Sequence, residues 1–184
     1  MTKVLKSMSA PTIRVKAVAT IIATVAAVAL PQLCHVIGDI SGLGSGLGEA
    51  FLPMHLPVML LGIFMGKYCG AVAGFAAPMI SFALTGMPKI GLLPFMAIEL
   101  CVYGFMMGAL KDKKMPVFGK VIISQVVGRA IRAIAIALAV YAFDYTALSL
   151  SVIWTSIAAG LPGLILQWCM IPLIAYYVNT KQAA

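Results

Sequence analysis

The residues most able to do polar chemistry in this sequence lie inside long apolar segments. Glu99 lies nine residues into the apolar segment that begins at about Ile90. In a helix this spacing corresponds to roughly 14 Å of rise, which reaches the middle of a bilayer. Arg129 lies nine residues beyond Lys120 and reaches a similar depth from the opposite side. We therefore predict that Glu99 and Arg129 are partners, because isolated charges in hydrocarbon are costly. Such a pair either contacts a ligand or only locks two helices together, and the sequence leaves both interpretations open.

Gln125 and Arg132 extend this pattern along one face of the same helix. Arg132 follows Arg129 by three positions and Gln125 precedes it by four, and residues at these spacings share a helical face. One carboxylate cannot neutralise two guanidinium groups. Arg132 also lies one turn further along the helix, so we predict that its partner is solvent or an anionic group on a bound molecule. An anionic substrate is our hypothesis.

Two further side chains are candidates for the same site. His55, between Pro53 and Pro57, can contact a ligand or a backbone carbonyl that the prolines leave free. Trp168, within the last apolar segment, can form an aromatic wall of a pocket. With one other histidine, His35, and four widely separated cysteines, we expect no metal site and no disulfide framework. The sequence contains no catalytic constellation and no nucleotide-binding motif, so we expect neither an enzyme nor a cofactor.

The composition indicates a membrane protein. Of the 184 residues, 62% are hydrophobic and 10% are charged, and the mean hydropathy is +1.07. A soluble domain of this size cannot hide so much apolar surface, because its outer faces must be polar. We predict an all-α polytopic membrane protein, since a helix of about 20 apolar residues crosses a bilayer with its backbone satisfied. Residues 1–184 then form one domain with six spans, at about 17–34, 50–66, 68–84, 90–110, 117–143 and 151–178.

The basic residues predict the orientation of these spans. Lys89 alone falls on one side of the membrane. Ten basic residues fall on the other, namely Lys3, Lys6, Arg14, Lys16, Lys67, Lys111, Lys113, Lys114, Lys120 and Lys181. The positive-inside rule therefore places both termini in the cytoplasm. The glycine-rich loop at 35–48 and the turn at 85–88 then lie outside, so a pocket beside them opens to the exterior. Charge placed in this way explains the net charge of +8 without a nucleic-acid partner.

Small residues form a stripe along the first span. Ala19, Ala23 and Ala27 recur at every fourth position and so lie on one helical face. Such stripes let a second helix approach closely, which is one way that helices associate in lipid. The stripe packs either against another protein or against helices of this chain, and the spacing allows both.

A further set of motifs lies between residues 49 and 110. It contains the sequence LPMHLPV at 52–58, Pro78, the sequence TGMP at 85–88, Glu99 with Tyr103 and Gly104, and four evenly spaced glycines, Gly62, Gly66, Gly70 and Gly74. Together with the chain length, the predicted spans and the alanine stripe, these motifs resemble the substrate-binding S components of energy-coupling-factor (ECF) transporters.

The resemblance implies a six-helix protein of the bacterial cytoplasmic membrane that captures a vitamin or related micronutrient from outside. It also implies partners, namely a transmembrane T component and two cytoplasmic ATP-binding subunits. The loop through Glu49 and the last three spans, with Tyr103, match the binding region of the family. The stripe of Ala19, Ala23 and Ala27 matches its face toward the T component.

The identity of the cargo is left open by these motifs. Nickel and cobalt members carry histidine where this chain has Thr2, so the resemblance gives no reason to expect a metal cargo. The two arginines favour a carboxylate-bearing vitamin such as pantothenate or a folate, and the motifs are also similar to members assigned to cobalamin or queuosine precursors. A stand-alone carrier, a small membrane enzyme and an assembly factor are the alternative interpretations.

Overall fold

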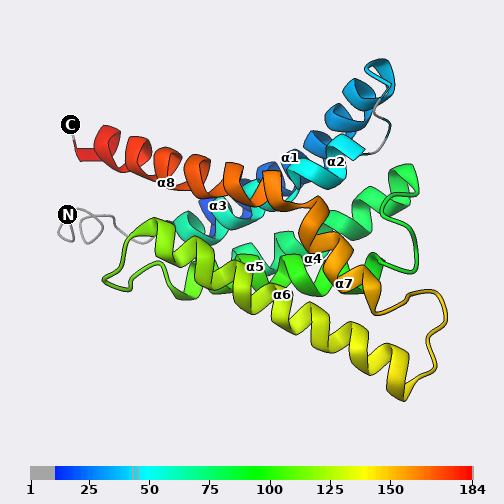
Figure 1. Cartoon of the computed structure of the whole chain (residues 1–184). Coiled ribbons are helices and arrows are strands. Elements are labelled where there is room, and N and C mark those ends of the chain that lie inside the picture. Colours follow the sequence, from blue (N-terminus) through cyan, green and yellow to red (C-terminus); the bar gives the residue numbers. More distant parts are fainter. Residues whose placement is uncertain (1–10, 43, 45, 184) are drawn as a thin grey trace.

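The computed structural model describes residues 11–42, 44 and 46–183, and over this part of the chain it contains helices and no strand (Figure 1). The prediction of an all-α fold is confirmed. Thr2, Lys3 and Lys6 lie outside the described residues. The helices are α1 (Ile13–Ile40), α2 (Gly46–Phe51), α3 (His55–Met65), α4 (Lys67–Thr85), α5 (Leu93–Ala109), α6 (Val117–Ala142), α7 (Ser151–Ala159) and α8 (Leu161–Ala183).

Four of these helices, α1, α4, α6 and α8, are long and apolar enough to cross a membrane. The two shorter apolar helices are α3, with 11 residues, and α5, with 17 residues. Large apolar side chains such as Ile21, Ile22 and Val25 of α1 are exposed on the surface of the bundle. Contact of such a surface with lipid is favourable, whereas its exposure to water costs free energy. These features fit a multi-pass membrane protein.

Two of the predicted spans are divided in the structure. The span predicted at 50–66 consists of α2 and α3, because Leu52 has a φ of 47° and Pro53 has no N–H for a continuous helix. The span predicted at 151–178 consists of α7 and α8, which meet at Gly160. Pro162 then lies in the first turn of α8, where proline is tolerated. Pro172 lies inside α8 without ending it.

Close backbone contacts hold α3, α4 and α5 together. A Cβ added at Gly70 of α4 would overlap with the carbonyl group of Gly104 in α5, and one added at Gly74 would overlap with the carbonyl group of Leu100. A Cβ at Gly62 of α3 would also overlap with the carbonyl oxygen of Gly104. Small residues at these spacings are the usual means of close helix packing in lipid. Three of the four evenly spaced glycines, Gly62, Gly70 and Gly74, are therefore used for packing within this chain, whereas Gly66 separates α3 from α4.

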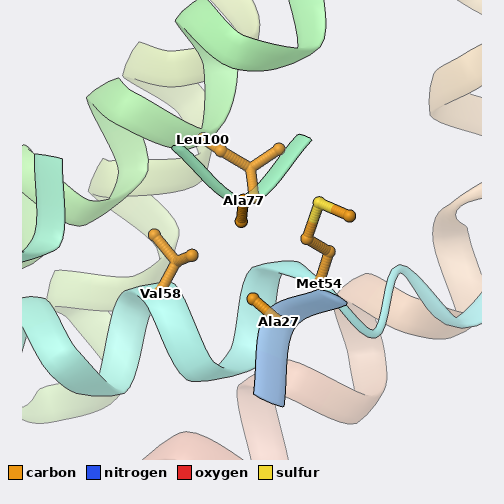
Figure 2. Close-up of a cluster of buried hydrophobic side chains, with 5 residues drawn as sticks. All are labelled: Ala27, Met54, Val58, Ala77 and Leu100. Carbon is orange, nitrogen blue, oxygen red and sulfur yellow. The ribbon is translucent and has the colours of Figure 1, made fainter. Parts of the chain in front are cut away.

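One end of the alanine stripe is also used within the chain. Ala27 is 0% exposed and packs in a cluster with Met54, Val58, Ala77 and Leu100 (Figure 2). Ala27 is therefore not available to a partner protein in this structure. Ala19 and Ala23, nearer the N-terminal end of α1, are half-buried.

We predict that Gly74→Ala lowers the free energy of unfolding by about 1–3 kcal/mol, the usual cost of overpacking. The physical reason is the overlap of the new Cβ with the backbone of Leu100. The measurement is unfolding by sodium dodecyl sulfate in mixed micelles, followed by circular dichroism. Gly46→Ala is the matched control, because no described atom lies within 4 Å of its added Cβ. Equal stabilities of the two variants would contradict the close packing of α4 on α5.

Candidate binding site

A cavity of about 420 Å³ lies at one end of the helix bundle. Its wall includes residues from the C-terminal part of α1, the start of α3, the connection between α4 and α5, and α7. The connection between α6 and α7 lies at this end, on the right of Figure 1, whereas the connection between α5 and α6 lies at the other. Small-molecule sites usually have volumes of about 300–1,000 Å³. The cavity therefore has the size of a small-molecule site.

Glu99 joins two helices in the wall of this cavity. Its side chain is 1% exposed, and its Oε2 accepts a hydrogen bond of 2.7 Å from Nη1 of Arg132. Its Oε1 accepts a hydrogen bond of 2.8 Å from the Tyr103 hydroxyl. The nearest approach of Arg129 is longer, 3.9 Å from Nε to Oε1. The structure thus brings four of the predicted site residues together.

The predicted contact between Glu99 and Arg129 is present at 3.9 Å, but the prediction that Arg132 has solvent or a ligand anion as its partner is wrong, because Arg132 makes the shorter contact with Glu99. The reason is the start of α5, which begins at Leu93 and not at the predicted Ile90. Residues 89–92 form a turn instead. Glu99 therefore lies about one turn nearer the end of the helix than expected, which is the level of Arg132 on α6.

The wall of the cavity carries more positive than negative charge. The side chains of Arg129 and Arg132 are 13% and 14% exposed, and both line the cavity together with Lys89. Among the described lining residues, Glu99 is the only acid. The Nε atoms of both arginines also have no hydrogen-bond partner within the part of the chain that the structure describes. These free donors and the excess charge suit an anionic ligand, since guanidinium groups bind carboxylates and phosphates strongly.

His55 lies in the same wall, at the first turn of α3. Its backbone N–H bonds the carbonyl oxygen of Leu52 at 3.1 Å, across the break before the helix. Its ring is 2% exposed and lies 5.2 Å from the Tyr103 ring, centroid to centroid. Tyr103 itself does not line the cavity; its role is to donate the hydrogen bond to Glu99.

Gln125 and Trp168 do not line the cavity. The Trp168 indole N–H donates to Oε1 of Gln125 at 2.6 Å, and Nε2 of Gln125 donates to Oε1 of Gln167 at 2.9 Å. Gln167 in turn donates to the carbonyl oxygen of Leu52 at 3.3 Å. This chain of hydrogen bonds ties α6 and α8 to the break before α3. The structure thus gives Gln125 and Trp168 a structural role.

The remaining predicted site residue is Glu49. Its backbone belongs to α2, and its side chain lies outside what the structure describes. Within the described residues, there is no group of three or more histidine, cysteine, aspartate or glutamate side chains arranged to hold a metal ion.

Several lining residues were not predicted from the sequence. They are polar residues of α7 and α4 and three methionines, namely Thr155, Ser156, Ser81, Met54, Met87 and Met96. The sequence signal for the α7 residues was Gly160 followed by Pro162, which marks a helix end within the long apolar segment. The methionines have no signal of their own, because methionine is common in any apolar core.

No protein-family model matches this chain, and neither a curated protein nor a solved structure matches it significantly. Its function must therefore be inferred from its own residues and their geometry. The geometry is that of a cavity with an excess of positive charge in an apolar helix bundle.

We predict that Arg132→Gln destabilises the protein more than Arg129→Gln. The first substitution removes a charge-assisted hydrogen bond from buried Glu99 and should cost about 3–5 kcal/mol, as expected when a buried pair is broken. The second removes only the contact at 3.9 Å and should cost about 1 kcal/mol or less. Unfolding in mixed micelles gives both values. Equal destabilisation would contradict the assignment of Arg132 as the closer partner.

We also predict that Gln125→Leu lowers the free energy of unfolding by about 1–3 kcal/mol, because it leaves buried groups of Trp168 and Gln167 unpaired. The same unfolding assay measures this effect. Gln32→Leu is the control, since the Gln32 amide makes an exposed hydrogen bond to Thr85, and it should change stability little. A stable Gln125→Leu protein would show that the hydrogen-bonded chain contributes nothing to the fold.

Proposed function

We propose that this protein is the substrate-capture subunit of an ECF-type importer in a bacterial cytoplasmic membrane. Its ligand is an anionic vitamin or related micronutrient, bound in the cavity beside Arg129 and Arg132. The observation that carries the proposal is the excess positive charge in the cavity wall, where Glu99 contacts both arginines. The resemblance of the motifs between residues 49 and 110 to those of S components supports it.

The proposal includes six spans. α3 and α5 cross the membrane as well as the four long helices, and α2 and α7 extend the spans that contain α3 and α8. Residues 46–65 then form one interrupted crossing of about the length that a bilayer requires. Backbone that departs from a helix is tolerated at this depth where it is packed in protein or lines a cavity, and Leu52 and Pro53 do line the cavity.

The orientation supports uptake from outside. Lys67 and the lysines between α5 and α6 lie at the end of the bundle opposite the cavity, whereas Lys89 lies beside it. With both termini in the cytoplasm, the positive-inside rule accommodates this distribution. The cavity then opens toward the exterior.

The partners in this proposal are a T component and two ATP-binding subunits, because the chain has no nucleotide-binding motif of its own. The face of α1 that meets the T component is the part around Ala19 and Ala23, since Ala27 is buried in this chain. Uptake by vesicles that contain this chain without the ATP-binding subunits would instead favour the stand-alone carrier.

We predict that an anionic compound co-purifies with the protein from native membranes and is detected by mass spectrometry. Arg129→Gln should reduce the amount of this compound about tenfold or more, since one charge-assisted contact is lost. Lys113→Gln is the control for charge alone, because Lys113 is exposed in the connection between α5 and α6. A protein that holds no small molecule, or a neutral compound that the Arg129→Gln variant retains, would contradict the proposal.

A further inference from the structure

Both ring nitrogens of His55 are buried beside the cavity, and neither forms a hydrogen bond of good geometry with a described residue, although the ring interacts with the backbone of Leu52. Most buried side-chain polar atoms have a partner, and an unpaired one is destabilising. The Tyr103 hydroxyl donates its proton to Glu99 and makes no hydrogen bond to the His55 ring. The His55 side chain thus borders the cavity while the donor and the acceptor of its imidazole form no hydrogen bond of good geometry with a described residue.

The rest of the wall combines apolar and sulfur-containing side chains with a few uncharged polar groups and a second histidine, namely Gln32, His35, Ser81, Thr155 and Ser156. Met54, Met87 and Met96 line the cavity, and so do Pro31, Pro53 and Pro88. None of the lining residues within the described part of the chain is phenylalanine, tyrosine or tryptophan. Thioether groups make favourable contacts with aromatic rings and adapt to their shape. A flat aromatic body therefore suits this wall.

The His55 imidazole and the guanidinium groups of Arg129 and Arg132 belong to the same cavity. Arg132 bonds Glu99, Glu99 bonds Tyr103, and the Tyr103 ring packs on His55. This series of contacts places the imidazole and the guanidinium groups along the same wall of one cavity.

We propose that the ligand class is a nitrogen-containing heteroaromatic carboxylate. The carboxylate binds Arg129 and Arg132, the ring lies against the methionines, and a ring nitrogen forms a hydrogen bond with the His55 imidazole. This inference rests on the proposed anion site and adds a second, separate contact to it.

The test compares three probes of matched shape, namely naphthalene carboxylate, quinoline carboxylate and the neutral quinoline carboxamide. Their affinities are measured by calorimetry on the purified full chain. Quinoline carboxylate should bind the unsubstituted protein about tenfold more tightly than naphthalene carboxylate, the effect of about one hydrogen bond. In His55→Leu this preference should fall to about one, while the melting temperature does not decrease, because the substitution removes an unpaired buried polar group.

The outcomes separate this inference from the proposed function. An unchanged preference in His55→Leu overturns the His55 contact and leaves the anion site standing. A carboxamide that binds as tightly as the carboxylate contradicts the anion site, and the preference for quinoline over naphthalene still tests His55. Failure of all three probes to bind overturns the ligand class.

A second measurement tests the contact without substituting His55. The chain has two histidines, so the ¹⁵N signals of His55 can be assigned with the His35→Gln variant. Quinoline carboxylate should shift the signal of one His55 ring nitrogen, and naphthalene carboxylate should not. Equal shifts with both probes would overturn the hydrogen bond.

Discussion

The carboxylate of Glu99, held between Tyr103 and two arginines in an apolar bundle, is the interaction on which the rest of this structure depends. It joins α5 to α6 and forms part of the cavity wall. Buried ion pairs often contribute no more stability than apolar side chains of the same shape. A second arginine adds an unbalanced charge and makes a purely stabilising role harder to explain. This imbalance of charge supports the proposed anionic ligand.

The packing of glycines determines which way α5 presents this carboxylate. Leu100 and Gly104 face the glycines of α4, and this contact sets the rotation of α5 about its axis. Glu99, one residue earlier, is then turned toward α6. On α6, a Cβ at Gly128 would overlap with the Tyr103 ring, so glycine lets Tyr103 and Glu99 approach Arg129 and Arg132. The polar site thus depends on small residues that themselves bind nothing.

The sequence predicted α4 and α6 well, and α1 and the register of the site less well. The span predicted at 17–34 is α1 at Ile13–Ile40, so the first residues of the loop predicted at 35–48 are helical. The span predicted at 68–84 is α4 at Lys67–Thr85, and the one predicted at 117–143 is α6 at Val117–Ala142, because lysine, glycine and proline mark their ends. The predicted start of α5 at Ile90 was three residues too early, although Pro94 marks the first turn of this helix. This error moved Glu99 by about one turn, and the contact between Glu99 and Arg132 was therefore not predicted. Gln125 and Trp168 were assigned to the pocket from the sequence. An amino-acid sequence does not show that side chains of α6 and α8 form hydrogen bonds with one another, as these residues do in the structure.

The two breaks in the helices explain how a cavity exists in such an apolar bundle. They lie side by side, since a Cβ at Gly160 would be 2.8 Å from Cδ1 of Leu52 and 3.3 Å from Nη2 of Arg129. The carbonyl oxygen of Leu52, freed by the first break, accepts hydrogen bonds from the His55 N–H and from Gln167. In lipid, irregular backbone is tolerated only where protein groups or a cavity satisfy it. Membrane transporters place such breaks at their binding sites for the same reason. The breaks at Leu52 and Gly160, next to a guanidinium group, are therefore further support for solute binding at this position.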